Sequence, residues 1–257
     1  MSYPDFGDCK DLRGRSPVDP AIFKEPRTLI LLVAGQSMWS NSSNAAPYVP
    51  WTGGVFEFNI ADGQCYPSDG GPVLGANIFL PGRISITPYL ADLIVANNKA
   101  SRVLMVNVCV NGTTAQDWSP VGQCYPRIPY VLNQLETLGI SPNYCCFLQG
   151  QADVANGDTH DNYVNLRVWC FNAMRGAGYS GPIVNGLGVH WTNVSDVNPT
   201  EAAAIKQGQF DAAVTAGISA GPDDDEFGDA YRVDGVHWND GGRYYTTQRW
   251  LPAIPVF

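Results

Sequence analysis

Three residues of this chain have the types and local settings that nucleophilic catalysis requires. Ser37 lies two residues after Gly35, just past an almost wholly apolar run at 28–34. A serine hydroxyl is a weak nucleophile without a base, and His237 can supply one. Asp234 lies three residues before it in the segment DGVH, where a tight turn can orient one imidazole nitrogen. These residues predict acyl transfer through Ser37.

Short apolar runs alternate with segments of helical spacing along the chain. Such runs are typical of strands buried on both faces of a parallel sheet. The alternation predicts a three-layer α/β/α sandwich of the flavodoxin-like kind, with a mostly parallel five-stranded sheet. We expect strands at 28–34, 102–110, 144–148, 182–189 and about 227–233, and helices at 84–97, 128–138, 161–175, 199–216 (capped by Thr200) and from about Asp240.

The sequence predicts one domain, at 28–257, preceded by an irregular extension. Residues 1–27 are rich in Pro, Gly and charge, and either pack on the domain or lead in from a partner. Residues 41–81 have no clear periodicity and are expected to form a large loop on the ligand-binding side. Ligands bind at the carboxyl ends of the strands in such sheets. The segments GQS, NGTTAQDW and QGQAD should therefore meet at one edge.

Four segments carry a resemblance to a known family. The chain resembles the SGNH hydrolases, specifically the branch of sialate O-acetylesterases and acetyl xylan esterases of carbohydrate esterase family six. GQSM is similar to the GQSNM nucleophile block, NGTTAQDW to the GGTxxxxW block, and QGQAD to the QGExD block. DGVHWNDGG is similar to the final DxxH block. The four segments follow one another in the family's order.

The resemblance implies a mechanism and a site. Ser37 would be the nucleophile, with Asp234 and His237 completing a triad. The oxyanion hole would consist of the backbone N–H groups of Ser37 and Gly112 and the side-chain amide of Gln149. The implied reaction is hydrolysis of O-acetyl esters on a carbohydrate through an acetyl-enzyme, with no cofactor and no metal. Residues within or next to these segments are expected to bind substrate, namely Gln36, Trp39, Asn111, Gln151, Trp118 and Trp238.

Two departures from the family pattern leave alternatives open. Gln151 stands where the family has Glu, and Asp153 could compensate; Met38 stands where it has Asn. A catalytically inactive carbohydrate-binding module on the same fold is therefore an alternative. A lipase-like esterase for long acyl chains is disfavoured, because the loops expected at the site are polar and rich in Gly and Asn.

Other residues compete for the catalytic roles. Ser219 lies in GISAG, which matches the GxSxG elbow, but an Ala-rich helix is expected before it where the elbow needs a strand. His190 is a second candidate base without a local carboxylate, and His160 lies in a loop rich in Gly and Asp. Trp191, beside His190, could line a sugar cleft together with the other tryptophans.

Composition restricts the partners and the compartment. With 24 acidic and 15 basic residues, the net charge of −9 repels a phosphate backbone and argues against nucleic acid. No apolar stretch is long enough to span a membrane, and the start lacks the pattern of a signal peptide. The localisation stays open. A virion-associated domain, such as part of a phage tail spike attached through its N-terminal segment, would suit these features and the carbohydrate chemistry.

The seven cysteines predict neither a zinc site nor a dense disulfide framework, because no CxxC pair occurs. The sequence GQCYP occurs twice and places Cys65 and Cys124 in similar settings, so a bridge between them is a hypothesis. The acidic cluster at 223–226 lacks the spacing of a calcium loop and is expected to be a solvated loop.

Overall fold

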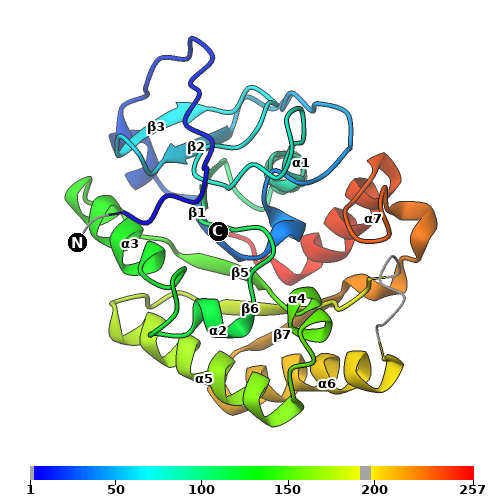
Figure 1. Ribbon diagram of the computed structural model, residues 1–257. Helices are drawn as coiled ribbons and strands as arrows, with labels where there is room; N and C mark the ends of the chain where they lie inside the picture. The colour runs from blue at the N-terminus through cyan, green and yellow to red at the C-terminus, as the bar shows by residue number, and fades with distance from the viewer. Residues whose placement is uncertain (1–2, 192–197) are drawn as a thin grey trace.

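The computed structural model describes residues 3–191 and 198–257. They form three layers, with a seven-stranded sheet between two layers of helices (Figure 1). The strands are β1 (Thr28–Gly35), β2 (Val55–Asn59), β3 (Gln64–Pro67), β4 (Arg102–Asn107), β5 (Tyr144–Leu148), β6 (Ile183–Leu187) and β7 (Ser219–Asp223). The helices are α1 (Thr87–Ala96), α2 (Ala115–Trp118), α3 (Arg127–Thr137), α4 (Gln151–Ala155), α5 (His160–Gly176), α6 (Pro199–Ala216) and α7 (Asp240–Trp250). The predicted α/β/α class is confirmed.

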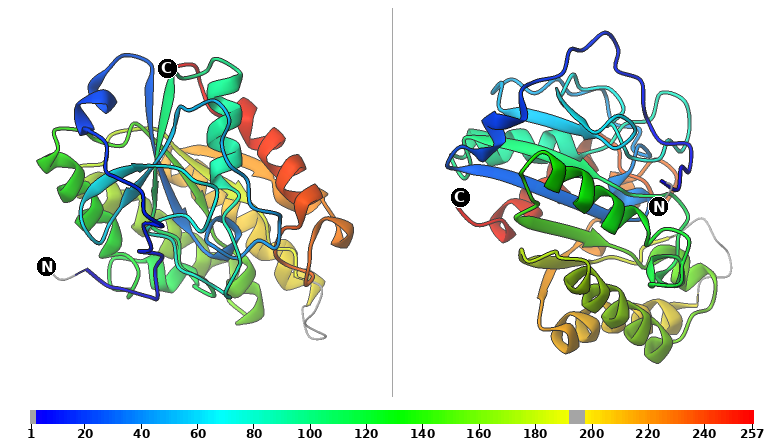
Figure 2. Two further views of the ribbon diagram at one scale, coloured as in Figure 1. Left: turned by 90° about the horizontal axis from the view of Figure 1, so that it is seen from above. Right: turned by 90° about the vertical axis from the view of Figure 1, so that its left-hand side faces the viewer.

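Strand β1 lies at the centre of the sheet, whose order is β3-β2-β4-β1-β5-β6-β7. It pairs in parallel with both β4 and β5, and all of its residues are buried. Its side chains alternate between two cores, with Leu32 in the core under α3 and α5 and Leu31 in the core under α1 and α7. Figure 2 shows α1 and α7 side by side on one face of the sheet.

Three strands differ from the prediction. Strands β2 and β3 lie within the segment expected to be a loop, and β7 replaces the strand expected at 227–233. A charged residue, Glu57, is fully buried inside β2 and obscures its apolar pattern. Strand β7 has the sequence SAGPD, without β-branched or aromatic residues, and is held by pairing with β6.

The five predicted helices are confirmed, with small differences at their ends. Helix α6 is capped by Asn198, whose Oδ1 accepts the N–H of Thr200 at 2.9 Å, rather than by Thr200 itself. Pro199 occupies the first helical position, where no N–H is needed. Helices α2 and α4 were not predicted because each has only four or five residues, too few to show a period.

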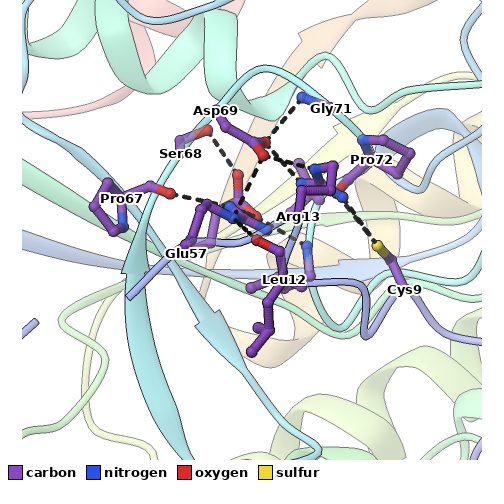
Figure 3. Close-up of polar contacts among 12 residues, drawn as sticks. Cys9, Leu12, Arg13, Glu57, Pro67, Ser68, Asp69, Gly71 and Pro72 are labelled. Carbon is purple, nitrogen blue, oxygen red and sulfur yellow. Dashed lines mark hydrogen bonds and ion pairs between the residues drawn. The ribbon is translucent and has the colours of Figure 1, made fainter. Parts of the chain in front are cut away.

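Residues 9–18 of the N-terminal extension pack along the β2–β3 edge, and Figure 3 shows the contacts that Cys9 and Arg13 make there. Arg13 forms two hydrogen bonds to Asp69, at 2.6 and 2.7 Å. Arg15 lies 3.1 Å from buried Glu57. Val18 pairs with β3, so the segment covers an edge that would otherwise present unpaired backbone groups.

A buried arginine joins this extension to the sheet. Arg127, at the start of α3, is fully buried and donates to the carbonyl oxygens of Pro4, Gly75 and Val108 at 2.7–2.9 Å. It also pairs with the carboxylate of Asp8 at 2.8 Å. Three segments distant in sequence therefore depend on one guanidinium.

We expect Arg127→Met to lower the free energy of unfolding by about 3–5 kcal/mol, because it leaves a buried carboxylate without its cation. Urea unfolding followed by circular dichroism measures this change. The double variant with Asp8→Asn should recover part of the loss, since the uncompensated charge is then removed. A loss below about 1 kcal/mol would show that the pair does not hold the extension.

All seven cysteines are buried and free, so the hypothesis of a bridge between Cys65 and Cys124 is wrong. Both pack in the core under α3 and α5 as small apolar side chains. Among the helices that the structure describes, none has the length and apolar character needed to cross a membrane.

Candidate active site

The carboxyl ends of neighbouring strands form one small cavity. Its volume is about 120 Å³. It is lined by residues that follow β1, β4, β5 and β6, by Phe79, and by part of the loop before α7. The lining residues are Gln36, Ser37, Phe79, Gly112, Gln151, Ala152, Trp191, Val236 and His237. The predicted nucleophile and the predicted base, 200 residues apart, therefore share one cavity.

A sharp turn after β1 holds Ser37 at the cavity. Gly35 has φ +114°, and a Cβ there would lie 2.0 Å from the carbonyl oxygen of Leu148 on β5. Only glycine fits so close to the neighbouring strand. The chain then enters the short 3-10 helix η2 (Ser37–Trp39), and Ser37 is 5% exposed.

We expect Gly35→Ala to lower the free energy of unfolding by about 2 kcal/mol or more, through the clash and the strained φ. Thermal unfolding measures the change. Gly157→Ala is the matched control, because Gly157 also has a positive φ but a Cβ there meets nothing within 4 Å. Equal losses in the two variants would mean that the contact with β5 contributes nothing beyond the backbone strain.

The turn at 234–237 fixes the imidazole as predicted from the sequence. Gly235 has φ +76°, and the Oδ1 atom of Asp234 accepts the backbone N–H of His237 at 2.8 Å. The Oδ2 atom of the same carboxylate lies 2.8 Å from Nδ1 of His237. This contact places the ring proton on Nδ1 and leaves Nε2 as the nitrogen able to accept a proton.

The surroundings of His237 favour its neutral form. Burial lowers the pKa of His237, the positive charges of Arg83 and Arg232 add to this, and Asp234 opposes it without reversing the direction. For Asp234, burial raises the pKa, but the hydrogen bonds and charge of His237, together with the N–H of Val236, outweigh burial and lower the pKa overall. A neutral imidazole beside an ionised carboxylate is the state in which a histidine acts as a general base.

Gln149 is placed differently from its predicted role as an oxyanion donor. Its side chain is fully buried, and it is not among the residues that line the cavity. Its Nε2 atom donates to Gln36 Oε1 and to Asp153 Oδ2, both at 2.8 Å, and to the carbonyl of Thr113. Two hydrogens face three acceptors, so this amide is engaged in holding the loops together. Gly112, in contrast, lines the cavity on a turn with φ +67°.

Gln151 lines the cavity and is fully buried. Neither its Nε2 nor its Oε1 has a hydrogen-bond partner among the residues that the structure describes. A buried amide without a partner costs free energy, so such a group in a cavity indicates a ligand-binding position.

Three tryptophans predicted to bind substrate lie in the core instead. Trp39, Trp118 and Trp238 are at most 1% exposed and pack between helices and sheet. Large aromatic side chains next to strand ends pack between the helices and the sheet, so the prediction that these three bind substrate is wrong. Trp191, in contrast, lines the cavity.

Gln36 and Phe79 also line the cavity. Gln36 was predicted, whereas Asn111, also predicted, is not among the lining residues and its Oδ1 accepts the hydroxyl of Ser40. Phe79 was not predicted, yet its ring lies 4.8 Å from the ring of His237. It belongs to the segment 41–81, which had no period to indicate its position.

The competing serine and histidines lie outside the cavity. Ser219 opens β7 after helix α6, which ends at Ala216 with Gly217 as its C-cap, so it has no strand–serine–helix geometry. His190 does have a carboxylate, since its Nε2 lies 2.9 Å from Asp229, but it is not among the lining residues. His160 lies between Asp161 and Asp211, whose hydrogen bonds raise its pKa.

The acidic cluster is structural rather than solvated, which corrects that prediction. Asp224 is 1% exposed and accepts the hydroxyl of Thr246 at 2.6 Å. Asp225 accepts the backbone N–H groups of Val189 and His190 at 2.8–3.0 Å and so fixes the loop after β6. Among the described residues, no group of three or more His, Cys, Asp or Glu is placed to hold a metal ion.

Comparison with solved structures establishes the fold. A protein from Arabidopsis thaliana aligns with TM-score 0.65 and 14% identity, over 90% of this chain and 98% of that one. A lipase/acylhydrolase from Enterococcus faecalis aligns with TM-score 0.54 and 11% identity, over 88% of this chain and 95% of that one. A catalytic mutant of an acetylxylan esterase from Geobacillus stearothermophilus aligns with TM-score 0.56 and 12% identity, over 90% of this chain and 94% of that one. The chain has the α/β fold of SGNH hydrolases. No protein-family model and no curated protein matches its sequence.

Proposed function

We propose that the chain is a serine esterase that removes acetyl groups from a carbohydrate. One observation carries the proposal: Ser37 and His237 line the same cavity, and Asp234 holds Nδ1 of that histidine at 2.8 Å. A buried serine that shares a cavity with an oriented, neutral imidazole is the constellation of nucleophilic acyl transfer.

The mechanism uses Ser37 and His237 in two steps. In the first, Nε2 of His237 takes the hydroxyl proton of Ser37 while the Oγ atom of Ser37 bonds to the ester carbonyl carbon. The tetrahedral intermediate collapses, and the departing sugar oxygen receives that proton. In the second step, a water molecule gives a proton to His237 and attacks the acetyl-enzyme. Acetate leaves, and Ser37 regains its proton.

The cavity size supports a short acyl group. At about 120 Å³ it is smaller than the roughly 150 Å³ cavity that accommodates one benzene molecule, so it fits an acetyl group but not a long chain or a sugar ring. The sugar would then lie at the rim, where Phe79 is 42% exposed. The similarity in fold to an acetylxylan esterase supports a carbohydrate as the alcohol.

A fluorophosphonate probe tests the proposal directly. We expect it to modify the wild-type protein once, at Ser37, as mapped by mass spectrometry of peptides. Ser219→Ala should still be labelled, and Ser37→Ala should not. Acetate release from a panel of acetylated polysaccharides then identifies the sugar. An unlabelled wild type would favour a binding module, and faster hydrolysis of octanoyl than of acetyl esters would favour a lipase.

A further inference from the structure

Gln151 differs from every other residue around the cavity in one respect. Buried side-chain atoms without a hydrogen-bond partner occur at several places in the described residues, but among these residues only Gln151 lines the cavity that holds Ser37 and His237. Its amide is fully buried within the wall of the cavity and has no protein hydrogen-bond partner among the described residues. An amide kept there without a partner is accounted for by a ligand atom that completes its hydrogen bonds.

The size of the cavity decides which part of a substrate reaches Gln151. A space of about 120 Å³ admits an acetyl group and excludes a pyranose ring, which is larger than benzene and carries hydroxyl groups. The carbonyl oxygen is the strongest hydrogen-bond acceptor of an acetyl ester. This oxygen is therefore the expected partner of the Gln151 amide.

The sheet order places Gln151 suitably for such a contact. Ser37 follows the central strand β1, Gly112 follows β4 on one side, and Gln151 follows β5 on the other. A carbonyl carbon attacked by Ser37 would thus have its oxygen between the loops that carry Gly112 and Gln151. Gln149, the donor expected from the sequence, has its amide hydrogens engaged elsewhere.

We propose that the Nε2–H of Gln151 donates to the carbonyl oxygen of the acyl group and stabilises the oxyanion that forms when Ser37 attacks. The inference rests on the proposed esterase function and makes Gln151 a catalytic residue of that reaction. Gln151 itself transfers no proton: the Ser37 proton passes to His237, the C=O electron pair moves onto oxygen, and the amide hydrogen bond from Gln151 to that oxygen strengthens. A neutral amide suits this role, whereas a carboxylate would repel the developing charge.

The experiment compares Gln151→Leu and Gln151→Glu with the wild type on p-nitrophenyl acetate and on an acetylated xylose. Leu removes the donor at similar volume, and Glu removes it while keeping the shape and adding a negative charge. We expect kcat to fall by about 10²-fold to 10³-fold on both substrates, with KM within about threefold. The melting temperature of Gln151→Leu should not fall, because the amide lacks a protein partner. Gln123→Leu, at an exposed glutamine, should leave kcat unchanged.

Distinct results would overturn the inference. An unchanged kcat on p-nitrophenyl acetate with a raised KM for the acetylated xylose would mean that Gln151 contacts the sugar. A lowered melting temperature with little change in kcat would mean a structural role. A wild type without Ser37-dependent hydrolysis would overturn the esterase proposal together with this inference, whereas an active wild type with active Gln151 variants overturns this inference alone.

Discussion

Ser37→Ala should lower kcat for p-nitrophenyl acetate by about 10⁴-fold to 10⁶-fold, because among the described residues that line the cavity no second hydroxyl or thiol side chain is present. His237→Ala should lower kcat nearly as much, since the variant lacks the imidazole nitrogen that accepts the proton of Ser37. The two residues act as a unit, so the double variant should be no worse than either single variant. Initial rates at saturating ester measure all three.

His190→Ala is the matched control for the base. His190 also pairs with a carboxylate, at 2.9 Å from Asp229, but it lies outside the group of cavity-lining residues. We expect it to retain most of the activity, and the melting temperature of Ser37→Ala should match that of the wild type. Retained activity in Ser37→Ala would remove this serine from the mechanism. A larger loss in His190→Ala than in His237→Ala would reassign the base.

The fold could be predicted where burial alone determined the residue types. Strand β5 was predicted with its observed ends, because a strand covered on both faces must be apolar throughout. Strand β2 could not be predicted, since Glu57 breaks its apolar pattern and is made tolerable by Arg15, which lies 42 positions earlier. Strand β7 exists through its pairing with β6, which a local reading of SAGPD does not reveal.

The candidate site could be predicted where a short segment sets its own geometry. The turn at 234–237 encodes the contact between Asp234 and His237 within four residues, so spacing sufficed. The orientation of Gln149 depends on acceptors from two other segments, Gln36 and Thr113, besides Asp153 of its own segment, and its role could not be inferred from sequence. The positions of the tryptophans were predicted wrongly for a related reason: proximity to a candidate site residue does not tell which side of the backbone a ring packs on.

Because Asp234 and His237 lie within one turn, a single substitution at Asp234 can test how its charge affects the pKa of His237. The pKa of His237 is lowered from the usual 6.5 by burial, while the hydrogen bond and charge of Asp234 act in the opposite direction. A general base works only when neutral, so activity should fall as pH decreases through the pKa of His237. For the wild type, the midpoint of this acidic limb in kcat/KM should therefore lie below 6.5.

Asp234→Asn should lower kcat by about 10⁴-fold, because an amide can present a hydrogen to Nδ1 and stabilise the tautomer that leaves no free Nε2 lone pair. The residual activity should have its acidic limb at a lower pH than the wild type, since the group that raises the pKa of His237 has lost its charge. Profiles of kcat/KM from about pH 4 to 9 measure both effects. Unchanged turnover would show that another group orients the imidazole. A limb displaced upward would show that Asp234 does not supply the charge that His237 senses, because removing a neighbouring anion can only make protonation harder.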